Sequence, residues 1–206
     1  MTSLSKYERK LLCAIFYAKQ QNPEYLKAPW YEAWDLVLNE FIREEEKYSI
    51  CPQATLRTKT KTYSRNPDFV VYLTTSSGTS LQDIRATRRP IILIEVKPWH
   101  PEYVDHDRLT DYFMDTRIMD QMVEHWRAVF QQSNLEIQVN ASIMGVLAVG
   151  HMWKWVRMRV DDISPFNPHN TQEKSPSIIF LNWSGVLELG TPSSDEELRK
   201  LKSSLW

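Results

Sequence analysis

The stretches NPDFVVYL (residues 66–73) and IILIEVKP (residues 91–98) decide the fold of this chain. Each reads as a short β-strand, and the second opens with an apolar run typical of a buried strand. Glu95 and Lys97 interrupt this pattern two residues apart, so their side chains lie on the same face of the strand. Charged side chains are rarely buried unless they are paired or bind a metal. Glu95, Lys97 and Asp68 are therefore the first candidates for a functional site.

The two carboxylates have the chemistry of a hydrolytic metal centre. Phosphodiester hydrolysis needs an aligned water and neutralised phosphate oxygens, and a hard divalent cation on carboxylates supplies much of this. We expect Asp68 and Glu95 to reach one Mg²⁺, with the backbone carbonyl of Val96 pointing toward the same ion. Lys97 is then placed to hold the water or the phosphate, or to act as a base. The alternative is a plain Glu95–Lys97 surface pair, with Asp68 as a turn residue after Pro67.

Periodicity places further elements around these two stretches. Helices are predicted from the N-terminus to before Pro23, over about residues 29–48 and 109–132, and over residues 195–201 behind a Ser193/Ser194 cap. Strands are predicted over about residues 54–62, 68–74, 91–97, 143–149, 153–160 and 177–181. Residues 75–89 read as a polar excursion that ends at Pro90, where the third strand begins.

This order of elements predicts a mixed α/β domain. We expect a central mixed sheet of four to five strands flanked by helices, with extra helices at both ends. The chain is expected to form a single domain over residues 1–206. Within it, residues 1–28 are an accessory N-terminal helix, residues 29–160 the core, and residues 161–206 a C-terminal strand and helix.

Composition narrows the possible environments and partners. The 206 residues are 42% apolar and 25% charged, which argues against global disorder. A formal net charge of -1 argues against tight non-specific coating of DNA, but not against a local phosphate-binding cleft. The only cysteines, Cys13 and Cys51, lack metal-ligand spacing and fit reduced thiols. No run approaches the roughly 18 apolar residues of a membrane span. We expect an intracellular protein without a membrane partner, in the nucleus or the cytoplasm.

Pro67-Asp68 followed by Glu95-Val96-Lys97 resembles the signature of the PD-(D/E)XK nuclease superfamily. That superfamily includes restriction endonucleases, Holliday-junction resolvases and RecB-like exonucleases. The predicted helix, three strands, helix and strand of residues 29–150 resemble its core, which implies a restriction-endonuclease-like fold. The resemblance implies that Asp68 and Glu95 bind Mg²⁺ or Mn²⁺ and that Lys97 orients or activates water.

The resemblance also suggests two further site residues. Many members add an acidic residue from the helix before the first strand, and we favour Glu40 because it flanks the apolar stripe of that helix. The other acidic candidates are Glu32, Glu44, Glu45 and Glu46. RecB-like members carry a glutamine on the helix after the lysine, and Gln121 is the positional candidate. A solvated acidic helix face is the alternative for any of the glutamates.

Basic residues precede the first signature residue. Arg57, Lys59 and Lys61 alternate with threonines over residues 57–62, which predicts a strand with one basic face. Together with Arg65, this face could hold nucleic-acid phosphates beside the metal. A solvated edge strand, kept positive to prevent aggregation, is the alternative.

The sequence thus predicts a Mg²⁺- or Mn²⁺-dependent nuclease that hydrolyses phosphodiester bonds in nucleic acid. DNA is favoured over RNA, and endonuclease and exonuclease action both stay open. The alternative is a catalytically silent nuclease-fold module that binds nucleic acid or a protein partner. A third interpretation is an interaction domain in which the motif is accidental. Cutting both strands of a duplex would favour a homodimer.

Overall fold

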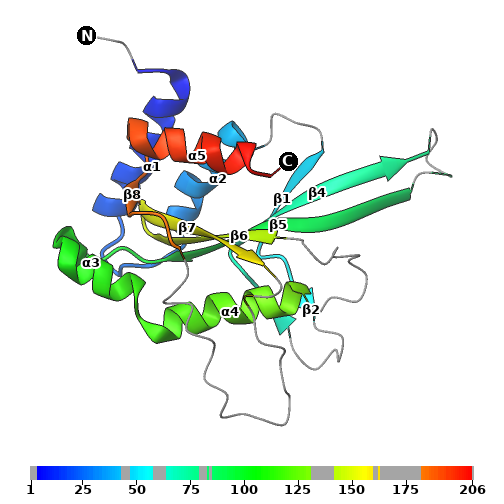
Figure 1. Cartoon of the computed structure of the whole chain (residues 1–206). Coiled ribbons are helices and arrows are strands. Elements are labelled where there is room, and N and C mark those ends of the chain that lie inside the picture. The colour runs from blue at the N-terminus through cyan, green and yellow to red at the C-terminus, as the bar shows by residue number, and fades with distance from the viewer. Residues whose placement is uncertain are drawn as a thin grey trace.

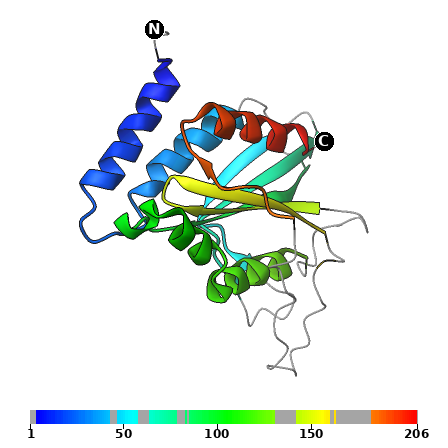
Figure 2. The same cartoon turned by 60° about the vertical axis from the view of Figure 1, so that its left-hand side comes forward.

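A computed structural model describes residues 4–42, 47–57, 64–78, 83, 85–130, 142–159, 162 and 182–205. They form a mixed α/β fold in which a sheet lies between two layers of helices (Figures 1 and 2). One layer contains α1 (Lys6–Gln20), α2 (Trp30–Phe41) and α5 (Pro192–Ser203). The other contains α3 (His106–Phe113) and α4 (Thr116–Phe130), preceded by a short 3-10 turn (Pro101–Val104). Within the described residues no helix is long and apolar enough to cross a membrane.

The main sheet has six strands rather than the four to five that were predicted. Its spatial order is β1-β4-β5-β6-β7-β8. Strands β5 and β6 are parallel, and every other neighbouring pair is antiparallel. The strands are β1 (Tyr48–Pro52), β4 (Phe69–Ser77), β5 (Arg85–Lys97), β6 (Ser142–Val149), β7 (Met152–Arg159) and β8 (Leu187–Glu188). A separate two-stranded sheet pairs β2 (Leu56–Arg57) with β3 (Ser64–Arg65).

Each face of the sheet buries its own core. Alternate residues of β5 point to opposite faces, so Ile92 and Ile94 join the core under α1, α2 and α5, whereas Leu93 joins the core under α3 and α4. Glu95 and Lys97 continue the alternation of Leu93 and therefore lie on the α4 side. The predicted strand at residues 143–149 and its hairpin partner are confirmed as β6 and β7.

The first strand of the sheet is not where the sequence predicted it. Helix α2 ends at Phe41, and β1 at Tyr48–Pro52 pairs with β4. Among the described residues of the predicted strand at 54–62, which are residues 54–57, Leu56–Arg57 forms a strand, and it belongs to the small sheet. Residues 58–63 lie outside the described residues. The sequence pattern of β1 is weak because the strand is five residues long, ends in proline and fully buries only Tyr48.

The single helix predicted over residues 109–132 is two helices. Helix α3 ends at Phe113 and α4 begins at Thr116. Between them, Oδ1 of Asp115 accepts the backbone N–H of Arg117 at 2.8 Å. An aspartate in this position satisfies a free donor at the start of a helix and so favours a new N-terminus over a continuous helix.

The predicted polar excursion of residues 75–89 is largely strand. Strand β4 continues to Ser77 and β5 begins at Arg85, so the two form a long hairpin that projects from the sheet (Figure 1). Pro90 lies inside β5 rather than at its start, opposite Tyr72 at a register shift of β4. Proline is tolerated at such a bulge because no ladder hydrogen bond needs its nitrogen.

The end of the chain also differs from the prediction. The last helix runs from Pro192 to Ser203, and its cap is Thr191, whose hydroxyl accepts the N–H of Ser194. Proline at a first helical position has a suitable φ and no N–H to leave unbonded, which favours this earlier start. The strand predicted at residues 177–181 lies outside the described residues, and the two-residue strand β8 is too short to give a pattern.

Gly145 in β6 packs directly against the ring of Trp126 on α4. A Cβ atom at this position would stand 2.0 Å from Cζ2 of the fully buried Trp126. We expect Gly145→Ala to lower the free energy of unfolding by about 1–3 kcal/mol, because the packed ring has no room to move aside. Gly185→Ala is the matched control, since a Cβ there meets nothing within 4 Å. Equal urea midpoints for the two variants would contradict this packing.

His151 is a buried histidine that should make the fold sensitive to acid. Burial, helped by the nearby charge of Lys19, lowers its pKa to about 3. Oε1 of Glu188 lies 3.4 Å from its Nε2, but that carboxylate is half exposed and does not offset the cost of burying a charge. In the folded chain His151 is therefore neutral at physiological pH.

The sign of the pH effect follows from the unfolded state, where histidine titrates near pH 6.5. The contribution of neutral His151 to the free energy of unfolding is fully present above that pH. It is lost as the pH falls from about 6.5 toward about 3, because the unfolded chain then binds a proton that the folded chain does not. We expect it to contribute a slope of up to about 1.4 kcal/mol per pH unit in this window. Urea unfolding of His151→Gln from pH 7 to 4 should give a shallower slope than the wild type, and an equal slope would contradict the assignment.

Candidate active site

Asp68 occupies the bend immediately before β4, where the ladder between β4 and β5 ends. The last pair of that ladder is Phe69 opposite Ile94, so β4 offers no backbone partner further along β5. The side chain of Asp68 takes that place, because its Oδ2 accepts the backbone N–H of Val96 at 2.8 Å. This hydrogen bond anchors the carboxylate to β5, and Asp68 is only 3% exposed.

Two side chains bind the other oxygen of Asp68: Lys27 lies in the loop before α2, and Tyr31 lies in the first turn of α2. Nζ of Lys27 lies 2.9 Å from Oδ1, and the hydroxyl of Tyr31 donates to the same oxygen. Burial alone lowers the pKa of Lys27, but its hydrogen bond to Asp68 and the charges of Asp68 and Glu95 raise it overall. Burial and the bond to Asp68 also raise the pKa of Tyr31, so the phenol keeps its proton. The charge of Asp68 is thus neutralised by an ammonium group.

Glu95 is fully buried and is bound by three side chains. Its Oε1 accepts from Nζ of Lys97 at 2.9 Å and from Nε2 of Gln121 at 2.8 Å, and its Oε2 lies 3.0 Å from Nε2 of His125. Gln121 also accepts a hydrogen bond from Lys97. Gln121 and His125 are four residues apart on α4, which places both on one helix face.

The environment of Glu95 keeps it ionised. Burial raises its pKa, but the hydrogen bond from His125 and the charge of Lys97 outweigh burial and lower the pKa overall. Because an ionised carboxylate only accepts, Nε2 of His125 carries the shared hydrogen. Nδ1 of the same ring is buried and has no partner among the described residues. Lys97 is nearer to solvent than Glu95, with 15% of its side chain exposed against 1% for Glu95.

A count of lone pairs shows what the two carboxylates could bind. Each carboxylate oxygen can accept about two hydrogen bonds. Oδ1 of Asp68 and Oε1 of Glu95 each accept two from the described residues, whereas Oδ2 and Oε2 each accept one. Each carboxylate therefore keeps acceptor capacity on one oxygen.

This donor set fits one hard divalent cation that completes its shell with water or phosphate oxygens. Mg²⁺ is usually bound by one or two carboxylates and substrate phosphates rather than by a closed protein cage. Across the described parts of the chain, no group of three or more His, Cys, Asp or Glu side chains is arranged to hold a metal by itself. Asp68 and Glu95 are the residues that could hold the ion, and the role of the Val96 carbonyl stays a prediction.

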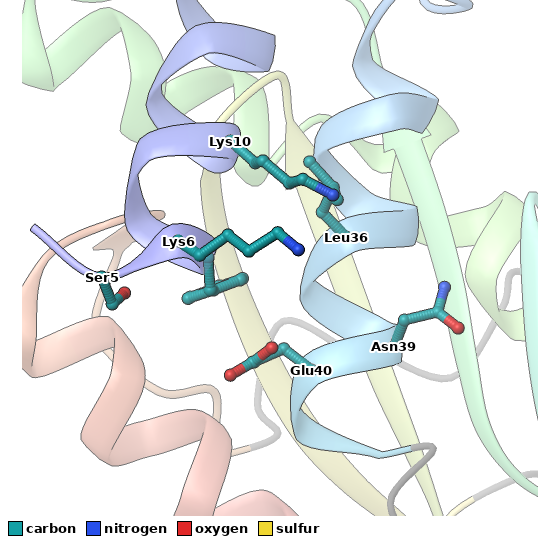
Figure 3. Close-up of a pocket in the computed structure, with 7 residues that line it drawn as sticks. Ser5, Lys6, Lys10, Leu36, Asn39 and Glu40 are labelled. Atoms are coloured by element: carbon teal, nitrogen blue, oxygen red, sulfur yellow. The ribbon is translucent and has the colours of Figure 1, made fainter.

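The structure does not bring Glu40 to this site. Glu40 points into a groove of about 420 Å³ between α1 and α2 (Figure 3), lined by Ser5, Lys6, Tyr7, Lys10, Leu36, Asn39 and Glu40. It lies nine residues beyond Tyr31, which corresponds to about 13 Å along the helix. Tyr31, not an acid, is the α2 residue that contacts Asp68. Glu32 is exposed on α2, and residues 43–46, which include the other candidates, lie outside the described residues.

The basic residues upstream are only partly described. Arg57 lies in β2, with no description of its side chain, and Lys59 and Lys61 lie outside the described residues. Arg65 lies in β3, and its guanidinium is 3.2 Å from a carboxylate oxygen of Glu124 on α4. The contribution of this group to nucleic-acid binding stays a prediction.

Three side chains at the site were not predicted as site residues. His125 had a usable signal, because its spacing from Gln121 places both on one helix face. Lys27 and Tyr31 had none. They are 41 and 37 residues from Asp68 in sequence, and only the packing of α2 on the sheet brings them there.

Comparison with protein-family models gives no match, and comparison with curated protein sequences gives none either.

Proposed function

We propose that this protein is a Mg²⁺- or Mn²⁺-dependent nuclease that hydrolyses phosphodiester bonds, with DNA favoured over RNA. The observation that carries the proposal is the meeting of two buried carboxylates, Asp68 and Glu95, at the ends of adjacent strands. Lys97 and Gln121 are hydrogen-bonded to Glu95 and to each other, and Asp68 accepts the backbone N–H of Val96, the residue between Glu95 and Lys97. A surface ion pair would not require the burial of Glu95 or its three donors.

The arrangement of the elements supports a restriction-endonuclease-like core, which is part of the proposal. Helix α2 is followed by β1, β4 and β5 as three antiparallel neighbours. The chain then passes through α3 and α4 and returns as β6, parallel to β5. This is the order that the sequence resemblance implies, although β1 replaces the predicted strand at residues 54–62.

The proposed roles follow from what each group contacts. A bound divalent cation would neutralise phosphate oxygens and increase the acidity of water. Asp68 and Glu95 would hold that ion through the oxygens that keep acceptor capacity. Lys97, which is more exposed than Glu95, would orient the attacking water or the phosphate. Gln121 positions Lys97 and Glu95 relative to each other, and His125 keeps the Glu95 carboxylate in place.

A second candidate function is a catalytically silent module that binds nucleic acid or a protein partner. One observation favours it: the ammonium groups of Lys27 and Lys97 neutralise both carboxylates without any metal. In that case the cluster would stabilise the end of the sheet and would have no turnover.

One assay separates these two functions. Purified protein is incubated with single-stranded, double-stranded and branched DNA and with RNA, each with Mg²⁺, with Mn²⁺ and with EDTA. The proposal expects metal-dependent cleavage of at least one DNA substrate, absent in EDTA and restored by Mn²⁺. Binding of nucleic acid without cleavage of any substrate would support the silent module instead.

A further inference from the structure

The loop between α1 and α2 fixes the position of one lysine beside the carboxylates. Asn22 is buried, and its side-chain amide bonds both the N–H and the carbonyl of Leu26, at 2.8 and 2.6 Å. The next residue is Lys27, whose carbonyl accepts the N–H of Trp30 at 3.0 Å in the first turn of α2. The backbone of Lys27 is thus held on both sides.

The helix alone does not explain a lysine at this position. The N-terminus of a helix carries partial positive charge, so a cation there is unfavourable. The compensating contact is with Asp68, whose Oδ1 lies 2.9 Å from Nζ. The lysine side chain is 43% exposed and the aspartate 3%, so the ammonium lies between the buried carboxylate and solvent.

We propose that the ammonium group of Lys27 stays paired with Asp68 when metal binds and thereby limits the site to one divalent metal ion. This inference rests on the proposed function and deepens it. Lys27 and Tyr31 together occupy Oδ1, and the N–H of Val96 occupies part of Oδ2. Two-metal phosphodiesterases place their ions about 3.5–4 Å apart around shared ligands. A second ion at Asp68 would need Oδ1 and would meet the ammonium of Lys27.

The direct test is Mn²⁺ binding to the full-length chain, measured by calorimetry and electron paramagnetic resonance. Wild-type protein should bind one Mn²⁺, and Lys27→Met should bind it about 3- to 10-fold more tightly, because a competing cation has been removed. Lys19→Met is the matched control. It removes the same charge from the end of α1, where Nζ lies 5.8 Å from the ring of Trp99 rather than on Asp68. Its affinity should stay close to the wild-type value.

A second readout uses the metal-free protein. Lys27→Met should lower the melting temperature without metal, because Asp68 then stays buried without its cation. Saturating Mn²⁺ should raise the melting temperature of Lys27→Met by more than that of the wild type. If Lys27 served only to stabilise the fold, Lys27→Met would lower the melting temperature without metal, but Mn²⁺ would raise it no more than in the wild type.

The outcomes separate this inference from the proposed function. If Asp68→Asn abolishes Mn²⁺ binding but Lys27→Met binds like the wild type, the inference is overturned and the proposed function stands. Two Mn²⁺ ions per wild-type chain would also overturn the inference. If only Lys27→Met binds Mn²⁺, through Asp68, then Lys27 excludes the metal altogether, and both the one-metal inference and the metal-dependent activity of the wild type fail. If neither protein binds Mn²⁺, both fail.

Discussion

Asp68→Asn is expected to lower the rate of Mn²⁺-dependent DNA cleavage on the order of 10³-fold or more. A metal that stabilises transition-state charge contributes several kcal/mol, and each 1.4 kcal/mol corresponds to about tenfold in rate. Asparagine keeps the size of the side chain but removes the charge and replaces one acceptor oxygen by a donor. Because Oδ2 faces the N–H of Val96 and Oδ1 faces Lys27, either orientation of the amide places a donor against a donor.

The matched control for this variant is Glu40→Gln. It removes one carboxylate from the exposed side of α2, in the groove beside α1, and should leave the rate unchanged within about twofold. Single-turnover cleavage of one DNA substrate by both variants gives the comparison, and circular dichroism checks that each is folded. A wild-type rate for folded Asp68→Asn would show that the site is assigned wrongly.

Lys97→Met should reduce turnover on the order of 10² to 10⁴, the range for loss of a group that positions or transfers a proton. The ammonium bonds both Glu95 and Gln121, but as a cation it does not bind a metal ion. Mn²⁺ binding should therefore be retained, whereas cleavage should not. Measuring both on the same preparation separates the role of Lys97 from that of the carboxylates.

The variant also has an expected pH signature. The charge of Lys97 is one of the influences that lower the pKa of Glu95, so that pKa should rise in Lys97→Met. The loss of Mn²⁺ binding in acid should then begin at a higher pH than in the wild type. Lys200→Met on α5, whose lysine pairs with Glu196 and Glu197, is the control and should change neither quantity. A wild-type rate for Lys97→Met would remove its catalytic role.

The core of the candidate site could be predicted because its residues interrupt local patterns. Glu95 and Lys97 follow an apolar strand at alternating positions, and their shared face follows from the backbone alone. Gln121 was suggested by its place on the following helix, and the structure brings it to Glu95. Lys27 and Tyr31 could not be found this way, because nothing near them in sequence indicates that the start of α2 packs beside Asp68.

The same distinction between local and tertiary signals explains the fold. The α/β class, β6 and β7 follow from strong periodic patterns. Strand β1 depends on its pairing with β4, since its own five residues bury only Tyr48 fully. The break between α3 and α4 is favoured by one hydrogen bond that Asp115 accepts from the N–H of Arg117, within a pattern that otherwise continues as one helix.

The most direct test of a metal-bearing nuclease site is anomalous X-ray scattering from a crystal of the wild-type protein soaked in Mn²⁺. A single metal ion on the two carboxylates should give one strong peak at about 2.0–2.3 Å from an oxygen of Asp68 and an oxygen of Glu95. Lys27 should remain within hydrogen-bonding distance of Oδ1 of Asp68. A well-ordered site with no peak at these carboxylates, at a Mn²⁺ concentration that supports cleavage, would show that Asp68 and Glu95 do not form the metal site.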